Sequence, residues 1–260
     1  MFASKIEEFA EASARRHMPE KLQASEYVLP YHWLGMDNNC LVRYLSLSDE
    51  IARMIQWHAG PGVGLDIGCG DGRSTFEVQR RIGARFRLIG LDFDARAVHF
   101  ARLFAPEVES RVTDASGKLP FTNDSVQFLY SREVLEHITP KHVADFVGEQ
   151  YRVLQPGGVA IVVVPSTRLR LPPKHYRHYT EPELRQVFAQ FEPLETYGFG
   201  RTPNGWMSNK LFVLIDRLPG LWKLYRKLWV RTPASKGDVL IGCFRKPSAP
   251  QTAVGRTSDF

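Results

Sequence analysis

The sequence predicts an α/β fold with a doubly wound, mostly parallel sheet, and three observations support this class. From residue 63 onward, short apolar segments of strand length alternate with longer amphipathic segments of helical length. Glycine- and proline-rich breaks such as Pro156-Gly157-Gly158 separate these segments. Residues 159–164 form an unbroken apolar run rich in valine, which is typical of a strand buried on both faces of a sheet. This alternation indicates helices packed on both faces.

The core elements follow one another in a regular order. We expect helices at residues 74–82, 95–104 and 141–154, and a further helix that begins near Thr180. Thr180 is a suitable N-cap, and Pro182 fits the first helical turn. We expect strands at residues 63–67, 87–91, 111–113, 126–130, 159–164, 194–199 and 239–244.

The regions outside this core have their own patterns. Residues 1–60 are expected to form an N-terminal cap of helices and loops, with one amphipathic helix around residues 6–10. Ser48 is a plausible N-cap for a second helix, and the aromatic cluster at residues 27–33 suggests a loop. The tail, residues 247–260, is rich in Pro, Ser, Thr and Gly, so we expect it to be disordered.

Composition places the chain among ordinary globular proteins. Hydrophobic residues make up 43% and charged residues 24% of the 260 positions. The three cysteines, Cys40, Cys69 and Cys243, are too few and too far apart to indicate a disulfide framework or a zinc site. Residues 1–17 mix charged and apolar side chains, unlike a secretory leader, and no apolar run approaches the roughly 20 residues of a membrane span. We therefore expect a cytoplasmic protein.

The strongest motif is the run Asp66-Ile67-Gly68-Cys69-Gly70-Asp71-Gly72, between the first predicted strand and the first core helix. Glycines there let the backbone approach a ligand and expose N–H groups at a helix start. The spacing is G-x-G-x-G, and Arg73 stands where a dinucleotide fingerprint has its third glycine. A tight turn without a ligand would use similar residues, so the motif needs its context.

Two acidic residues at later strand ends supply that context. Asp92 ends the second strand 22 positions after Gly70, where a carboxylate accepts hydrogen bonds from ribose hydroxyls. Asp114 follows the third strand, where a carboxylate can accept a hydrogen bond from the exocyclic amine of adenine. Three successive strand ends thus offer the groups that a nucleoside needs.

These segments together resemble the class I S-adenosylmethionine-dependent methyltransferases, of the branch that includes ubiquinone-type and many small-molecule enzymes. Residues 131–138 resemble the family's segment after strand four, and Leu154-Gln155-Pro156-Gly157-Gly158 its turn before strand five. The resemblance covers about residues 50–200 and departs at Gln127, where an acidic residue is common. It implies S-adenosylmethionine as the cofactor, held by Asp66, Gly68, Cys69, Gly70, Gly72, Asp92, Phe93, Asp114, Ala115, Ser131 and Glu133.

The resemblance also completes the predicted architecture. It implies a seven-stranded sheet whose last strand, 239–244, is antiparallel, with N-terminal helices and a helical insert before that strand. The predicted domains are the cap at 1–60, the cofactor-binding core at 61–200, the insert at 201–236, the last core strand at 237–246 and the tail at 247–260.

Methyl transfer to oxygen requires removal of a proton, and histidine or a carboxylate suits that role. The candidate catalytic residues are His137, after the fourth strand, and His175 and His178, in the loop after the fifth. The alternative for His137 is packing at a helix start, and for the loop a solvated basic segment; Glu133 is a further candidate base. No H-x-x-H or H-E-x-x-H spacing occurs, so the sequence predicts no metal.

The insert at 201–236 carries eight basic side chains against Asp216 alone, a local net charge of +7 within a chain of +6. Residues 221–231 are patterned as a helix with an apolar face and a basic face. Such a helix suits an anionic membrane surface, here the inner membrane face through residues 217–231; the alternative is a lid packed on the domain.

The function predicted is transfer of the sulfonium methyl to a small-molecule, lipid-linked or glycan-linked acceptor, with a hydroxyl oxygen favoured. C-methylation of a quinone-like lipid and a cofactor-binding interaction protein without catalysis remain alternatives. A DNA amino-methyltransferase is disfavoured, because residues 131–134 read Ser-Arg-Glu-Val instead of the (D/N/S)-P-P-(Y/F) box. A nicotinamide oxidoreductase is disfavoured by the missing third glycine.

Overall fold

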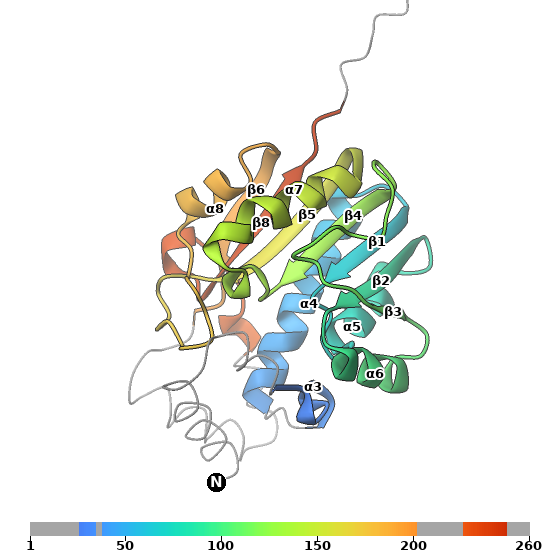
Figure 1. Cartoon of the computed structure of the whole chain (residues 1–260). Coiled ribbons are helices and arrows are strands. Elements are labelled where there is room, and N and C mark those ends of the chain that lie inside the picture. The colour runs from blue at the N-terminus through green and yellow to red at the C-terminus, as the bar shows by residue number, and fades with distance from the viewer. Residues whose placement is uncertain (1–25, 35–37, 202–225, 249–260) are drawn as a thin grey trace, which may run out of the picture.

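The computed structural model describes residues 26–34, 38–201 and 226–248, and this part holds one eight-stranded sheet with the order β3-β2-β1-β4-β5-β8-β6-β7 (Figure 1). Its parallel half starts from a central strand and winds outward in both directions, as predicted. The strands are β1 (Gly62–Ile67), β2 (Phe86–Asp92), β3 (Glu109–Val112), β4 (Val126–Arg132), β5 (Leu154–Pro165), β6 (Glu192–Phe199), β7 (Arg231–Thr232) and β8 (Val239–Arg245).

Strand directions confirm the doubly wound fold. β1 pairs in parallel with β2 and β4, β2 with β3, and β4 with β5. β8 runs antiparallel to both β5 and β6, which confirms the predicted antiparallel last strand. The prediction of seven strands missed β7, which adds two residues at the edge beside β6.

Helices cover both faces of the sheet. On one side lie α4 (Asn38–His58), α5 (Arg73–Ile82) and α6 (Ala95–Phe104), and on the other α7 (Val143–Val153) and α8 (Glu181–Val187) (Figure 1). Two apolar clusters fill the layers between helices and sheet, and the side chains of the predicted strand 159–164 alternate between them. Burial on both faces explains why this strand has no polar positions.

Two N-terminal predictions were wrong. Ser48 does not start a helix but lies inside α4, where its hydroxyl donates to the Tyr44 carbonyl at 3.0 Å. The helix begins ten residues earlier, because Val42 and Leu47 extend its buried apolar face. A serine hydroxyl inside a helix can donate its hydrogen bond to a backbone carbonyl of the preceding turn. The aromatic cluster is not a plain loop: it forms the short helices η1 (Glu26–Val28) and α3 (Tyr31–Leu34). The amphipathic helix expected around residues 6–10 lies outside the described residues.

Several local signals were confirmed. Thr180 caps α8 in a capping box with Glu183, whose carboxylate accepts from the Thr180 backbone N–H at 2.8 Å. The prediction that Pro156-Gly157-Gly158 is a break before the strand was wrong, since it lies within β5. The Gly157 N–H donates to the Lys246 carbonyl and the Lys246 N–H donates to the Gly158 carbonyl, which keeps this segment paired. The helix predicted at 141–154 is α7, preceded by the 3₁₀ turn η3 (Pro140–His142).

The basic insert is described only at its end, since residues 202–225 lie outside the described part. The helix predicted at 221–231 was wrong for Arg231, which belongs to β7. The described part of the insert contains two 3₁₀ turns, η4 (Arg226–Leu228) and η5 (Ala234–Lys236). The Trp229 side chain is 5% exposed and packs beside Phe199. The apolar side of this end therefore packs on the domain. Among the described helices, none has the length and apolar character needed to cross a membrane.

Candidate functional site: a cofactor cleft with a histidine-lined end

The glycine loop joins β1 to α5 and is tied to the neighbouring strand. The backbone N–H groups of Gly68 and Cys69 both donate to the Leu91 carbonyl, at 2.8 and 2.9 Å. Gly70 has φ +56°, and a Cβ there would lie 2.3 Å from the Tyr27 hydroxyl. Gly72 caps α5 with φ +79°, and a Cβ there would lie 2.7 Å from that of Ala101. Both positions therefore require glycine.

Asp92 fixes the same loop from β2. One of its carboxylate oxygens accepts from the Gly70 N–H at 2.8 Å, and the other accepts from the Asp94 N–H at 2.9 Å. Burial raises the pKa of Asp92, and these two backbone donors oppose that rise. Each oxygen keeps a further lone pair, so the carboxylate can still accept a hydrogen bond from a ribose hydroxyl.

The buried side chain of Asp66 is hydrogen-bonded to other side chains of the domain, which the sequence did not predict. Its Oδ2 accepts from the hydroxyls of Thr75, at 2.7 Å, and Tyr130, at 2.6 Å, which ties β1 to α5 and β4. Burial raises the pKa of Asp66 to about 6, although the two hydroxyl donors lower it. The carboxylate therefore supports the glycine loop from below as well as facing the cleft.

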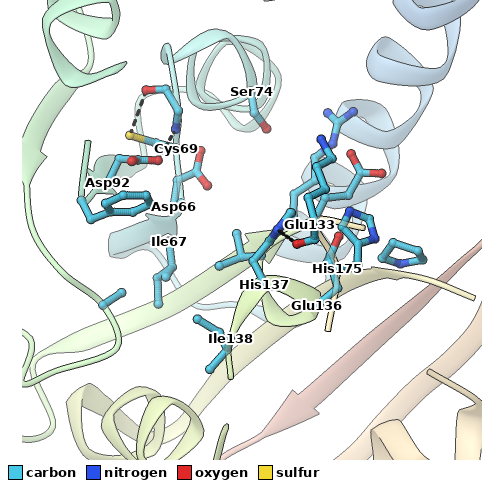
Figure 2. Close-up of a pocket in the computed structure, with 18 of the residues that line it drawn as sticks. Asp66, Ile67, Cys69, Ser74, Asp92, Glu133, Glu136, His137, Ile138 and His175 are labelled. Atoms are coloured by element: carbon cyan, nitrogen blue, oxygen red, sulfur yellow. Dashed lines mark hydrogen bonds between the residues drawn. The ribbon is translucent and has the colours of Figure 1, made fainter. Parts of the chain in front are cut away.

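These residues line one cavity of about 620 Å³. All of the predicted site residues border it except Gly72, which caps α5, and Ser131, whose side chain is buried within β4. In Figure 2, Cys69, Asp66 and Asp92 lie on one side of this cavity and Glu133, His137 and His175 on the other. Phe93, Asp114 and Ala115 extend the first side, and the Asp114 carboxylate accepts from the Ser116 N–H at 2.8 Å.

Glu133, directly after β4, lies on the same side of the cavity as His137 and His175 (Figure 2). Its backbone has φ +56°, a left-handed conformation that is uncommon for a residue other than glycine. Its carboxylate forms an ion pair with Arg43 of α4. Burial favours the neutral form, but the charges of Arg43, Arg132, Lys174 and His32 outweigh it and hold the pKa of Glu133 at about 2. Glu133 is therefore an anion at neutral pH and a poor proton acceptor.

The three predicted histidines meet at the far end. The His137 and His175 ring centroids lie 4.6 Å apart, and His175 Nδ1 lies 2.9 Å from His178 Nε2. Burial lowers the pKa of His175 to about 3 and that of His178 below its usual value. The loop after β5 is therefore not a solvated basic segment, because its histidines are partly or fully buried in the cleft wall.

Sequence reasoning missed the N-terminal segment as part of the site. His32 donates its backbone N–H to Asp71 at 3.0 Å, its ring nitrogen contacts the same carboxylate, and the Trp33 indole donates to the Asp71 carbonyl at 2.8 Å. Tyr27 and Arg43 also line the cavity. The aromatic cluster was the visible signal, but its contact with the glycine loop spans almost 40 residues and no local pattern shows it.

A parallel sheet with a glycine turn after its first strand and a carboxylate after its second defines a nucleoside-binding domain of Rossmann type. Residues 65–158 match the family described as "Methyltransferase domain". The matched segment, residues 65–158, is therefore of the class I S-adenosylmethionine-dependent methyltransferase type, whose cofactor is S-adenosylmethionine.

Similar proteins agree with this assignment. A protein of Mycolicibacterium smegmatis named "Probable S-adenosylmethionine-dependent methyltransferase" is 34% identical over 146 residues, which cover 52% of this chain and 53% of that protein. The 2-phytyl-1,4-naphtoquinone methyltransferase of Thermosynechococcus vestitus is 31% identical over 102 residues, covering 38% and 44%. The chain thus spans about half the length of these curated relatives or less.

The fold also matches solved structures. The geranyl diphosphate C-methyltransferase of Streptomyces coelicolor A3(2) superposes with a TM-score of 0.52 at 22% sequence identity, covering 77% of each chain. At this identity the likeness supports the shared fold and nothing about the acceptor.

Proposed function

We propose that this chain transfers the sulfonium methyl of S-adenosylmethionine to a hydroxyl oxygen of a small-molecule, lipid-linked or glycan-linked acceptor. One observation carries the proposal: a single cavity runs from Asp92 and the glycine loop to the cluster of His137, His175 and His178. A cofactor bound at the first end directs its methyl toward the second, where groups that handle a hydroxyl proton are gathered.

The residues of the first end fit the cofactor. Gly70 leaves the space that a Cβ would fill, and the buried Asp92 carboxylate keeps acceptor capacity for the ribose hydroxyls. Phe93, 48% exposed at the cavity edge, offers an apolar surface for the adenine ring, with Asp114 beside it for the exocyclic amine. The bound cofactor supplies an activated methyl on a positive sulfur, and these side chains orient it.

The second end fits a hydroxyl better than a carbon acceptor. His175 and His178 are neutral at pH 7, because burial lowers the pKa of both. Neutral imidazoles can accept or relay a hydrogen bond from a hydroxyl, whereas an unactivated carbon acceptor gains nothing from them. The proposal assigns the three histidines to orienting the acceptor hydroxyl by hydrogen bonds.

C-methylation of a quinone-like lipid is the second candidate, favoured by the similarity to a naphthoquinone methyltransferase. A metabolite extract incubated with the protein and ¹³C-methyl-labelled cofactor separates the two, because O-methyl and C-methyl carbons have different chemical shifts. An O-methyl signal supports the proposal, and a C-methyl signal overturns the oxygen assignment. No labelled product from extracts that are rich in both kinds of acceptor favours an interaction protein without catalysis.

Cofactor binding is tested separately by calorimetry. We expect micromolar-range affinity for S-adenosylmethionine and S-adenosylhomocysteine and none for NAD. Tight NAD binding instead would overturn the proposal.

Contact of the basic insert with an anionic membrane, at the inner membrane face of a cytoplasmic protein, is also part of the proposal. Its support is the local net charge of +7, while the burial of Trp229 on the domain weighs against it. Co-sedimentation with anionic vesicles tests it: a variant with Lys223, Arg226 and Lys227 replaced by Gln should pellet less than the wild type. Equal pelleting of the variant and the wild type would refute membrane contact and favour a lid packed on the domain.

A further inference from the structure

Two of the histidines proposed to orient the acceptor, His137 and His175, lie beside a carboxyl group, that of Glu136, which the proposed function leaves without a role. Glu136 and His137 lie in the 3₁₀ turn η2 (Leu135–His137) after β4, and His175 lies in the loop after β5. One potential ligand atom from each lies within 4.8 Å of the others. Figure 2 shows the three residues gathered at the same side of the cavity, away from Asp92.

The carboxyl group of Glu136 has no hydrogen-bond partner among the described residues. The Glu136 side chain is 0% exposed, and neither carboxylate oxygen is hydrogen-bonded. Burial, and then the nearby charge of Glu133, raise the pKa of Glu136 well above its usual value, while Arg43 and Lys174 lower it. A buried carboxyl without a partner is costly, so it normally indicates a missing cation or donor.

The hydrogen bonds of the histidines fix where their lone pairs lie. His137 Nδ1 is 3.1 Å from the Lys174 carbonyl, which can only accept, so Nδ1 carries the proton and Nε2 the lone pair. His178 Nδ1 likewise donates to the Leu169 carbonyl at 3.2 Å, which leaves its Nε2 to accept from His175 Nδ1 at 2.9 Å. The lone pair of His175 is therefore also on Nε2. Both rings have the arrangement of metal-ligating histidines, whose other N–H donates to a carbonyl or a second acceptor.

We propose that Glu136, His137 and His175 bind a divalent first-row transition-metal ion, and that this ion holds the hydroxyl oxygen of the methyl acceptor. Two imidazoles and one carboxylate form a set that suits zinc, cobalt or iron(II) and leaves coordination positions open. Ligands about 2.1 Å from a tetrahedral zinc lie about 3.4 Å apart, so side-chain rotations of roughly 1 Å close the set. The ion neutralises the buried Glu136 carboxylate.

The second half of this inference rests on the proposed function and gives it a chemical form. The acceptor oxygen coordinates the ion, which lowers the pKa of its hydroxyl as it does for bound water, and the proton leaves to solvent. The oxygen lone pair then attacks the sulfonium methyl: the new O–C bond forms, the C–S bond breaks, and its electron pair stays on sulfur to give neutral S-adenosylhomocysteine. In this arrangement His137 and His175 are ligands, and His178 is a positioning residue that orients His175.

The first test is a titration of chelator-treated protein with Co²⁺, followed by visible absorption. We expect one Co²⁺ per chain, with d–d bands that Zn²⁺ displaces. Glu136→Gln and His175→Gln should weaken Co²⁺ binding by roughly 100-fold or more, above the 10- to 100-fold typical of losing an outer-shell partner. His142→Ala is the matched control, because His142 lines the same cavity but contacts Thr139 and is not one of the three proposed ligands. The Co²⁺ affinity of this variant should equal that of the wild type.

X-ray absorption of the zinc-loaded wild type gives a second measurement that needs no variant. We expect scattering from two imidazoles. No Co²⁺ binding by the wild type, equal loss in His142→Ala, or a zinc shell without imidazole would each overturn the proposal.

Calorimetry with S-adenosylmethionine on the same samples separates the metal site from the proposed function. Chelator treatment and Glu136→Gln should leave cofactor affinity within about twofold, since the ligand set lies at the other end of the cavity. If the wild type binds Co²⁺ but not S-adenosylmethionine, the proposed function is refuted and the metal site stands. If it binds S-adenosylmethionine but not Co²⁺, the metal site is refuted and the proposed function stands.

Discussion

The carboxylate of Asp92 holds the glycine loop and is proposed to bind the cofactor, so its removal should affect both stability and affinity. Asp92 accepts from the backbone N–H groups of Gly70 and Asp94 and borders the cavity where the ribose is proposed to lie. In Asp92→Asn the shape is kept, but one acceptor oxygen becomes an NH₂ donor. That group faces either the Gly70 N–H or the Asp94 N–H, and it can accept a hydrogen bond from neither of them, nor from a ribose hydroxyl.

The magnitude follows from the bonds lost. A hydrogen bond to a charged group contributes about 1.5–3 kcal/mol, so loss of one bond to the ribose should raise the Kd for S-adenosylmethionine about 10- to 150-fold. Whichever way the Asn amide turns, the N–H of Gly70 or of Asp94 loses its acceptor, which should lower the free energy of unfolding by about 1–3 kcal/mol. Both the affinity and the stability are therefore expected to fall.

Asp94→Asn is the matched control. Asp94 is a buried aspartate two positions away that caps α6 and accepts from the Arg96 N–H at 2.9 Å, but it does not line the cavity. Asn is an equally good N-cap, so cofactor affinity should stay within about twofold. Calorimetry and urea unfolding of both variants check the comparison. An Asp92→Asn protein with wild-type affinity and stability, or an equal loss in Asp94→Asn, would refute the reasoning.

Three further changes test other contacts. Asp66 has a pKa of about 6 when folded and about 3.9 when unfolded, so the wild type should lose roughly 2 kcal/mol of stability relative to Asp66→Asn as the pH rises from 4 to 7; a pH-independent difference in urea unfolding would refute this. Gly70→Ala should weaken cofactor binding more than tenfold, because its Cβ overlaps the Tyr27 hydroxyl, and Tyr27→Phe should restore part of the loss in calorimetry if that overlap is the cause. Trp33→Phe removes the indole bond to the Asp71 carbonyl and should cost about 1 kcal/mol in thermal or urea unfolding; no change would mean that the segment is not anchored there.

The fold was predictable where the signal is local. The run at 159–164 identified the central strand β5, and Thr180 with Glu183 identified the start of α8, because burial on two faces and a capping box each act within a few residues. The start of α4 was missed, because Ser48 looks like a cap until its carbonyl partner four residues earlier is known. β7 was missed because a two-residue strand exists only through its pairing with β6.

The site divides in the same way. That the glycine loop and Asp92 line one cavity could be predicted, because they lie at the ends of adjacent parallel strands, where chain order equals spatial order. The acceptor end was predictable only as a group of candidate histidines. Glu136 stood beside His137 in the sequence, but its burial and its proximity to His175 depend on how two loops fold against each other.

The contrast between the two ends suggests where the specificity of this protein lies. At the cofactor end, Asp92 and the glycine loop are bonded mainly to backbone, which leaves the geometry largely independent of side-chain changes elsewhere. At the acceptor end, the Tyr176 N–H donates to the Glu136 carbonyl and His137 binds the Lys174 carbonyl, so the loop after β5 sets the position of the ligand set. A change in that loop should therefore alter the acceptor while S-adenosylmethionine affinity stays the same, and a loop variant that loses cofactor affinity first would contradict this division.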